Sequence, residues 1–549
     1  MLLEKIRKAF SFLSQAEKNK LSRCALLLIF VFLFFATRIP YLSKDTINPD
    51  GVNWHYRSQQ FVVGLKFLQF EKTYQHYHPG VTLMWVTGIP IEIFKQVTNI
   101  KDYNLYNFQA FDFIAKFSLV IVQLVLSLLV IYALSKIVGF NKSFLTVVFF
   151  SFEPFFVGNS RLYHMDTLLS ILLFLAIIFS FLNLKNPSFG MSLLSGLFLA
   201  LSFLTKSVSI GAVLFVVLYA LAYFVYSKQY KSILPYVAYT LFFFVLFTFL
   251  LFPALWENPI YYLSLIFKEA ARVGIRKGHG QVVFGEYTRD PGFWFYPLVL
   301  LVKTSPFTII GCILFVVSSI KSLVIDVKEN IKNEIKMFKD TKKKFLNFGF
   351  YIAVFYLGYV FSMSFPTKKI DRYMLVVYPF MAYLAVVGYG KVFLFLKSKV
   401  KKLMFWSTIS LLCLVFWVMP FVRVYPYYFT YTSPLFINSQ TANKIVAQKP
   451  FGIGMYDLKE LIVKRYGSSK NLMTPKLAFV DTKPMKSIYP NSKVFDVRVS
   501  GPGQYDLLVL GVNEDIPENI ENSKYTFEKD ASMWINGLEY WRIYVKKEK

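Results

Sequence analysis

Long apolar stretches separated by short polar connections make up most of the chain. They fall at roughly 24–41, 110–135, 143–159, 166–184, 189–206, 208–226, 233–253, 297–320, 346–364, 373–390 and 403–421. Apolar runs of about 18 residues or more are typical of helices that cross a membrane. The pattern therefore predicts a polytopic, all-α membrane protein with about eleven transmembrane helices in residues 24–421.

From about Ser439 the pattern changes to the short alternating segments of a soluble domain. We expect strands at 451–456, 477–480, 494–499 and 505–511, a helix at 457–466, and an edge strand at 540–546. Residues 439–549 are therefore predicted to form a small α/β domain. Its Phe451-Gly452-Ile453-Gly454 run lacks the further glycine of a dinucleotide-binding loop, so we expect no nucleotide there.

Composition and charge agree with a membrane protein. Of the 549 residues, 55% are hydrophobic and only 17% are charged, yet the net charge is +29. Lysine and arginine collect in cytoplasmic loops and face anionic lipid, so we expect membrane lipid as the partner of this charge and no nucleic acid. Cys24, Cys312 and Cys413 lie in or beside apolar segments, which argues against a disulfide framework.

The charge bias predicts how the chain sits in the membrane. Most Lys and Arg residues of the connecting loops fall on one side if residues 1–23 are cytoplasmic. Loops 42–109 and 254–296 and the C-terminal domain are then extracytoplasmic, and we expect a multi-pass protein of the cytoplasmic (plasma) membrane. Residues 81–94 are apolar but short, and they contain Gly88 and Pro90. We interpret them as an interfacial or re-entrant helix; a thin transmembrane helix is the alternative.

Candidate chemistry is concentrated on the predicted outer side. Asp50 follows the first apolar segment, at the lipid edge where charge is costly, and His55, His76 and His78 share its loop. Cations near this face need anionic partners, from Glu153, Asp166 or Asp371, or from one bound phosphate group. The cations are Arg57, Arg161, Lys206, Lys303, Lys369 and Arg372. Asp112 and Lys116, four residues apart, are interpreted as a structural pair.

Several short motifs, in order over residues 1–435, resemble those of a known group of membrane enzymes. The chain resembles the lipid-carrier-dependent glycosyltransferases of the GT-C superfamily, which include protein O-mannosyltransferases, aminoarabinose transferases and bacterial phospholipid carrier-dependent glycosyltransferases. The motifs are Asp50, His78-Pro79-Gly80, Glu153-Pro154-Phe155, Arg161 with His164-Met165-Asp166, Leu204-Thr205-Lys206, Pro253-Ala254-Leu255-Trp256, Gly278-His279-Gly280, Asp290-Pro291-Gly292 and Lys369-Ile370-Asp371-Arg372-Tyr373. Members often carry two adjacent acids in the first loop, whereas Gly51 follows Asp50 here.

The resemblance implies a donor sugar, of the hexosyl or mannosyl type, on a polyprenyl phosphate, and a reaction that inverts the anomeric carbon. Asp50 would be the general base toward an acceptor hydroxyl, with desolvation raising its basicity, and His78 would orient Asp50 or touch phosphate. A capping role at Pro79 is the alternative for His78. The donor phosphate would bind Arg57, Arg161, Lys206, Lys303, Lys369 and Arg372, and the sugar or acceptor would contact Trp54, His55, Tyr77, His164, Asp166 and His279.

A metal or other cofactor is not expected, because His76 and His78 with Asp50 form only a weak ligand set. The sugar, the acceptor (protein, glycan or lipid) and the carrier length stay open, as does transfer of an oligosaccharide. Two other classes remain as alternatives. A transporter also has buried charges in many helices, although an inverted repeat is not evident. A glycosyltransferase-like scaffold would have lost activity with the second acid.

Overall fold

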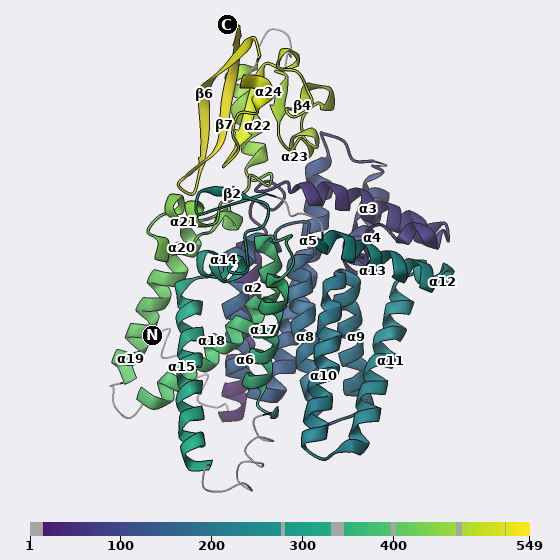
Figure 1. Cartoon of the computed structure of the whole chain (residues 1–549), viewed down its shortest axis with the longest axis vertical. Coiled ribbons are helices and arrows are strands. Elements are labelled where there is room, and N and C mark those ends of the chain that lie inside the picture. The colour runs from purple at the N-terminus through teal and green to yellow at the C-terminus, as the bar shows by residue number, and fades with distance from the viewer. Residues whose placement is uncertain are drawn as a thin grey trace, which may run out of the picture.

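The computed structural model describes residues 15–100, 102–275, 280–330, 345–396, 402–467, 475–521 and 523–548. A bundle of helices carries a smaller α/β unit at one end (Figure 1). The helices of the bundle are α2 (Gln15–Arg38), α5 (Phe108–Val138), α6 (Phe140–Ser151), α7 (Pro154–Ser160), α8 (Asp166–Lys185), α9 (Phe189–Thr205), α10 (Ile210–Tyr226), α11 (Ile233–Leu251), α14 (Phe295–Lys303), α15 (Pro306–Asn330), α17 (Phe348–Ser364), α18 (Tyr378–Leu396), α19 (Lys402–Cys413) and α20 (Met419–Arg423).

The expected membrane helices are present. Within the described residues, six helical segments are long and apolar enough to cross a membrane, and four shorter apolar helices accompany them. The six are Asn19–Arg38, Phe108–Val138, Asp166–Lys185, Ser207–Tyr226, Tyr230–Leu251 and Asp371–Leu396. The protein is therefore a multi-pass membrane protein built mainly of helices, as the apolar pattern predicted.

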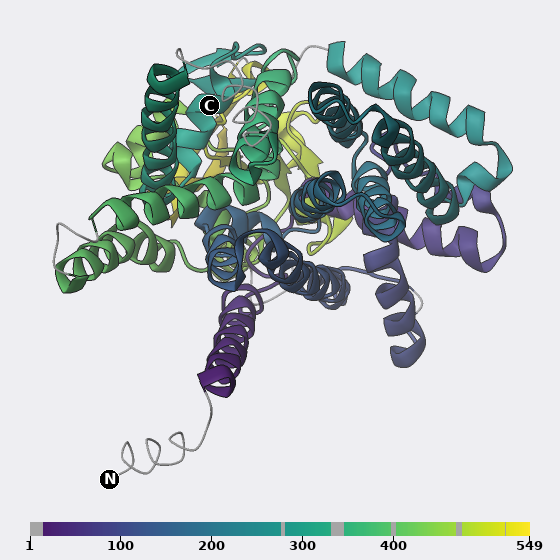
Figure 2. The ribbon, with the colours of Figure 1, turned by 90° about the horizontal axis from the view of Figure 1, so that it is seen from below.

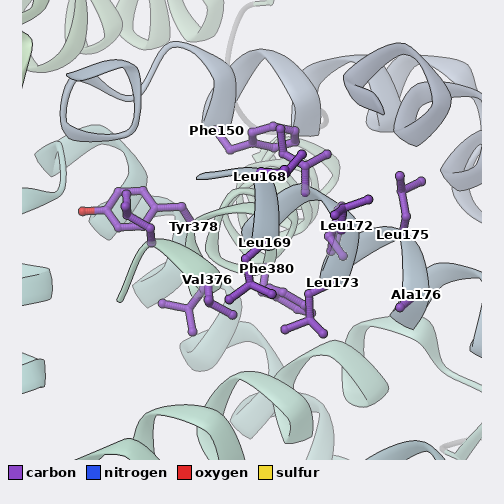
Figure 3. Packing of buried hydrophobic residues seen from close by; sticks show 14 of the residues in the cluster. Phe150, Leu168, Leu169, Leu172, Leu173, Leu175, Ala176, Val376, Tyr378 and Phe380 are labelled. Atoms are coloured by element: carbon purple, nitrogen blue, oxygen red, sulfur yellow. The ribbon is translucent and has the colours of Figure 1, made fainter. Parts of the chain in front are cut away.

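Helix α8 forms the centre of the bundle. The apolar segment of this helix is 94% buried, far more than that of any other candidate span among the described residues. Leu168, Leu172 and Leu173 on this helix pack near Phe150 of α6 and Phe380 of α18 (Figure 3). A helix that is apolar on all sides belongs in such an interior position, where each face has a protein neighbour. Asp166, at the first turn of α8, is thereby fixed at the end of the bundle.

Two predicted spans are each divided into two helices. Pro154 begins α7 after a break that follows α6, and Pro306 begins α15 after a break that follows α14. Proline removes a backbone donor, so it starts helices more readily than it continues them. The breaks face each other: Glu153 accepts hydrogen bonds from Ser305 Oγ (2.8 Å), Thr308 Oγ1 (2.9 Å) and the Ser305 backbone N–H. The Glu153 carboxylate thus satisfies the free donors at the start of α15.

Three helices lie across the end of the bundle. They are α3 (Pro49–Lys66), α4 (Val81–Thr98) and α13 (Pro259–Ile275), the last following the short α12 (Ala254–Glu257). Figure 1 shows them between the bundle and the C-terminal unit, and in Figure 2 α13 runs along the rim of helices seen end-on. The interpretation of residues 81–94 as an interfacial helix is consistent with this arrangement. Both long loops and the C-terminal unit therefore share one end of the molecule.

The C-terminal unit is built on a five-stranded mixed sheet with the order β4-β3-β5-β7-β6. Strands β3, β4 and β5 are parallel, and β7 is antiparallel to both β5 and β6. The elements are α21 (Ser439–Ile445), α22 (Met455–Tyr466), β3 (Leu477–Phe479), α23 (Lys483–Lys486), β4 (Val494–Asp496), β5 (Leu507–Gly511), α24 (Glu518–Glu521), β6 (Tyr525–Ile535) and β7 (Leu538–Glu548).

Two details of the predicted sheet are wrong. The tail strand β7 is not at an edge, because β5 and β6 pair with its two sides and β6 takes the edge. Residues 451–456 are not a strand; Phe451 and Gly452 have positive φ angles of 47° and 71° and form a tight turn. Polar and apolar residues alternate both in strands and in turns of this kind, so the pattern alone could not distinguish a strand from a turn.

The turn joins the C-terminal unit to the loop before α3. The Ile47 N–H donates to Gly452 O (2.9 Å), and the Gly454 N–H donates to Asp45 O (2.7 Å). A Cβ atom at Gly452 would lie 2.0 Å from Ile47 O, so only glycine permits this approach. The chain on both sides of the join then enters the cavity described below.

Candidate active site

A cavity of about 430 Å³ lies where the bundle, the crossing helices and the C-terminal unit meet. Segments that are far apart in the sequence, from Pro49 to Asp481, supply its walls. Its charged and histidine lining residues are Asp50, Arg57, His76, His78, His164, Lys206, Lys303, Lys368, Asp371, Arg372, Lys449 and Asp481. Six lysines and arginines face three aspartates here, so the cavity suits an anionic ligand.

Asp50 lies in the first turn of α3, directly after Pro49, and 43% of its side chain is exposed to the cavity. Its Oδ2 atom is 3.1 Å from Arg372 Nη2 and 3.5 Å from His164 Nε2. A carboxylate in the first turn of a helix is also favoured by the helix dipole. Asp50 is therefore held as a fixed anion with an open side toward the cavity.

The pKa of Asp50 lies well below the usual range of an aspartate. Burial raises this pKa, but the hydrogen bond from His164 and the charge of Arg372 outweigh burial. We expected desolvation to raise the basicity of Asp50, and that expectation is wrong for the ligand-free protein. The physical reason is that two partners stabilise the charged form more than the partly open site destabilises it.

A second carboxylate lies beside Asp50. Asp166 is 2.8 Å from Lys206 Nζ, 3.0 Å from His164 Nδ1 and 3.9 Å from Arg372 Nη1. His164 and Arg372 thus lie between two carboxylates at the starts of two helices, α3 and α8.

The structure gives a steric reason for the missing adjacent acid. Gly51 is buried, and a Cβ atom there would lie 2.7 Å from the Asn48 amide oxygen. An acidic side chain at this position would force Asn48 to move. Asp166 instead brings the second carboxylate to the site from a distant part of the sequence.

Lys206 reaches the cavity because α9 ends one residue before it. The backbone becomes extended at Lys206, and the ammonium group lies 2.8 Å from Asp166 and 4.0 Å from the centre of the Tyr373 ring. Cation–π contact and the ion pair together fix its position.

Two further cations in the cavity lie against aromatic rings. Arg57 stacks over Trp54, with 4.7 Å between the guanidinium carbon and the ring centre. Lys303 Nζ lies 5.3 Å from the ring centre of Phe155. Within the part of the chain that the structure describes, neither cation has a carboxylate within ion-pair distance. They are the groups most ready to bind an incoming anion.

His76, Tyr77 and His78 form a stack of rings along one wall. The ring centres of Tyr77 lie 4.1 Å from His76 and 4.2 Å from His78. Burial and the charge of Arg57 lower the pKa of His76 to about 4, and burial and Lys206 lower that of His78 well below its usual value. Both rings are therefore neutral near pH 7. His78 can contact a phosphate by hydrogen bonding, but it does not add positive charge.

Four predicted site residues within the described part of the chain do not line this cavity, namely Arg161, His55, Lys369 and Asp166. Arg161 is fully buried: it pairs with Asp45 (2.9 Å) and donates to the carbonyls of residues 37, 38 and 40. His55 is also fully buried and contacts Asp112 (3.1 Å). Lys369 pairs with Asp290 (3.2 Å) next to the cavity. Asp45 and Asp112 are buried carboxylates, so Arg161 and His55 support the fold, whereas Lys369 pairs with an exposed carboxylate.

The remaining predictions have separate outcomes. Asp112 also contacts Lys116, which confirms the structural pair. His279 lies outside the described residues. Trp54, Tyr77 and His164 line the cavity, and Asp166 lies behind His164 and Lys206.

The C-terminal wall of the cavity was missed by sequence reasoning. Phe451 lies against Arg372, with 4.4 Å from the guanidinium carbon to the ring centre, and it stacks on Phe429 (5.2 Å). Lys449 and Asp481 also line this wall. The Pro450-Phe451-Gly452 run was the available signal, since proline and glycine around an aromatic residue indicate a turn. Among the described residues, no group of three or more His, Cys, Asp or Glu side chains is arranged to hold a metal ion.

Comparison with known proteins gives one sequence match to a family. The pattern of the family described as dolichyl-phosphate-mannose-protein mannosyltransferase matches residues 108–252. This region runs from α5 to α11 and contains His164, Asp166 and Lys206. No curated protein matches the chain in sequence.

Solved structures show a weaker, whole-chain similarity. ArnT from Cupriavidus metallidurans bound to undecaprenyl phosphate has 13% identity and a TM-score of 0.46, covering 94% of this chain and 97% of that one. The archaeal oligosaccharyltransferase AglB from Archaeoglobus fulgidus, in complex with an inhibitory peptide and a dolichol-phosphate, has 9% identity and a TM-score of 0.45. The alignment covers 97% of this chain and 74% of AglB.

The matched region contains three of the motifs that carried the resemblance, namely Glu153-Pro154-Phe155, His164-Met165-Asp166 and Leu204-Thr205-Lys206. Over residues 108–252 the chain is therefore similar to this mannosyltransferase family, in agreement with the resemblance.

Proposed function

We propose that the protein transfers a hexose, of the mannosyl type, from a polyprenyl phosphate to an acceptor hydroxyl, with inversion at the anomeric carbon. The observation that carries this proposal is the position of Asp50. An open carboxylate faces a cavity that also holds Lys206, paired with Asp166, and the cations Arg57 and Lys303, which have no carboxylate partner among the described residues. A base beside an anion-binding wall is what transfer from a sugar phosphate requires.

The proposed step has one bond formed and one broken. The acceptor oxygen attacks the anomeric carbon from the side opposite the phosphate, and its proton passes to Asp50. The bond from the anomeric carbon to the phosphate oxygen breaks, and polyprenyl phosphate leaves with the electron pair. Lys206, Arg57 and Lys303 stabilise the charge that develops on the phosphate, most effectively in a cavity that holds little water.

The low pKa of Asp50 fits this step once the donor is considered. In the ligand-free protein Arg372 and His164 stabilise the charged carboxylate and make it a weak base. A donor phosphate brings negative charge toward Arg372 and Lys206, and it competes with Asp50 for the guanidinium group. We infer that donor binding raises the pKa of Asp50, so the base becomes effective only when the donor is present.

The proposal also assigns partners and orientation. The cations of the cavity take the charge of the phosphate, so the reaction is proposed to need no metal and no other cofactor. The cavity lies on the extracytoplasmic side of the cytoplasmic membrane, with the N-terminus inside, because this orientation places the lysine-rich loops in the cytoplasm. The C-terminal unit then projects outward, and nucleic acid is not a partner.

The test is release of polyprenyl phosphate by the purified full-length protein in detergent, supplied with synthetic polyprenyl-phosphate sugars. Asp50→Asn removes the base and keeps the shape, and we expect it to lower turnover by about 10²–10⁴-fold. Glu92→Gln is the matched control, because Glu92 is an acid on the neighbouring crossing helix whose carboxylate contacts exposed Lys66 and Gln96. Equal turnover of all three proteins would refute the role of Asp50. No release by a folded wild type with any donor would refute the enzyme.

A further inference from the structure

A second cavity, of about 480 Å³, opens from the first one toward the sheet of the C-terminal unit. The two cavities share six lining residues, namely Pro49, Ala447, Gln448, Lys449, Phe451 and Asp481. Pro49 directly precedes Asp50 in the chain. The second cavity therefore adjoins the one that Asp50 lines.

The sheet topology explains why polar groups gather in this second cavity. Strands β4, β3 and β5 are parallel neighbours, so their carboxyl ends lie at one edge of the sheet. Arg498, Asp481 and Glu514 each follow the carboxyl end of one of these strands, and all three line the cavity. In open α/β sheets this edge is where ligands bind.

The polar groups offer more hydrogen-bond acceptors than the protein uses. Asp481 Oδ1 accepts from the Lys483 N–H (3.2 Å), and Glu514 Oε2 accepts from the Gly511 N–H (2.7 Å). Across the described ranges, neither the other oxygen of Asp481 nor that of Glu514 takes part in a hydrogen bond. Arg498 does not neutralise them by direct contact, since it forms a two-point pair with Asp496.

Gln448 gives the strongest indication that the second cavity binds a ligand. Its side chain is 6% exposed, and its Nε2 donates to Thr430 O (2.8 Å). Its Oε1 atom is buried and, in the part of the chain that is described, has no hydrogen-bond partner. A buried acceptor without a donor is costly, and Gln448 lines both cavities at their junction.

Aromatic rings complete the walls. Tyr287, on strand β2 (Glu286–Thr288) of the β1–β2 hairpin (β1, Gln281–Val283), is 67% exposed, and Phe451 lies opposite the sheet edge in the same lining. Carboxylates and an amide oxygen accept from hydroxyl groups, while aromatic faces pack against the C–H face of a sugar ring. The lining of this cavity combines Lys449 and Arg498 with Asp481 and Glu514, so it lacks the excess of positive charge that marks the cation-lined cavity.

From these observations we infer that the second cavity is an acceptor subsite for an uncharged carbohydrate, which presents one of its hydroxyl groups to Asp50. The inference rests on the proposed function and deepens it by naming the acceptor class. The β1–β2 hairpin and the C-terminal sheet form the two sides of the subsite. A glycan is thereby favoured over a peptide, which would be expected to use backbone pairing along an open strand.

The test is ligand-observed NMR of saturation transfer to free, uncharged hexose disaccharides and trisaccharides, with the purified full-length protein in detergent. We expect transfer with wild type, an affinity about tenfold lower with Asp481→Asn, and one about 3–10-fold lower with Tyr287→Ala. Both side chains are exposed, so folding should survive their replacement. Glu528→Gln is the matched control, since this exposed acid lies on β6 and pairs with Lys547.

The two proposals can fail separately. Release of polyprenyl phosphate by wild type, together with no saccharide binding or with equal binding by all variants, would overturn the subsite and leave the enzyme. Variant-sensitive saccharide binding without release from any donor would support the subsite and count against the enzyme. Variant-sensitive transfer to a Ser/Thr peptide in place of the saccharides would also overturn the carbohydrate assignment.

Discussion

Asp50 and Arg372 are 322 positions apart in the sequence, yet their carboxylate and guanidinium groups lie 3.1 Å apart. Arg372 also lies 3.9 Å from Asp166 and against the ring of Phe451. One guanidinium group thus joins the first loop, the central helix α8 and the C-terminal unit. Any anion that binds Arg372 changes the environment of Asp50, and this coupling underlies the first prediction.

The pH dependence of turnover should differ between the free enzyme and the donor complex. The low pKa of Asp50 keeps it ionised well below the usual aspartate range, so kcat/KM should show no acid limb from Asp50 between about pH 5 and pH 8. The acid limb of kcat should lie at higher pH, because the bound phosphate weakens the Arg372 contact. Steady-state rates against pH measure both profiles.

The His164→Gln variant tests whether Asp50 controls this pH profile. The hydrogen bond from His164 lowers the pKa of Asp50. Replacing His164 should therefore raise this pKa and move the acid limb of kcat/KM to higher pH. An unchanged limb in this variant would mean that another group controls the profile.

Arg57 should contribute to donor binding and little to folding. It stacks on Trp54 and has no ion-pair partner among the described residues, so Arg57→Gln leaves no carboxylate unpaired. We expect the KM for the donor to rise by about 10–100-fold, the range for a charge-assisted hydrogen bond, with a nearly unchanged melting temperature. Lys66→Gln, an exposed cation on the same helix, is the control and should change neither quantity.

Arg161 should behave in the opposite way. Arg161→Met leaves Asp45 buried without its cation, and we expect the free energy of unfolding to fall by about 3–5 kcal/mol. Adding Asp45→Asn should restore part of that loss, as thermal unfolding in detergent would show. Turnover per folded molecule should stay near wild type; a selective rise in donor KM would instead assign Arg161 to the phosphate site.

Glu514 should make the sheet less stable as the pH rises. Burial raises its pKa to about 7, and the Gly511 N–H and the charges of Arg542 and Arg498 do not offset this, while Asp481 raises it further. The folded state therefore holds the proton more tightly than the unfolded state. The stabilisation is complete below about pH 4.5 and is lost as the pH passes about 7.

Glu514→Gln removes that dependence. At about pH 8 we expect this variant to be more stable than wild type by about 1–2 kcal/mol, with the difference vanishing toward about pH 4.5. Hydrogen exchange of the β5 amides measures this locally. A constant difference across the pH range would show that Glu514 does not titrate as described.

Local sequence predicted the membrane helices because each is a long apolar run. It could not predict that Glu153 binds the start of α15, since that contact joins residues 152 positions apart. Proline at 154 and 306 marked both breaks, but only the packed structure shows that they face each other. The local sequence pattern also failed to predict the order of the C-terminal strands. Strand β6 was not predicted, and β7 was placed at the edge of the sheet that β6 occupies.

Site residues could be predicted from the sequence where a polar residue lies within or beside an apolar stretch. Asp50 and Lys206 were selected for that reason, and both line the cavity. Arg161 was selected by the same reasoning, yet it lies in the fold interior, because nothing near it in sequence reveals its partner Asp45. Phe451 and Gln448 enter the site through long-range contacts with the first loop, which no local pattern reports.

The most direct test of the account is the structure of the full-length protein in lipid nanodiscs with a polyprenyl phosphate bound, determined by electron cryomicroscopy. The account predicts phosphate density in the Asp50 cavity, in contact with Lys206 and Arg57, and an Arg372 side chain turned from Asp50 toward the phosphate. Phosphate held elsewhere, for example in the separate cavity beside Lys44, with the Asp50–Arg372 pair unchanged, would contradict it.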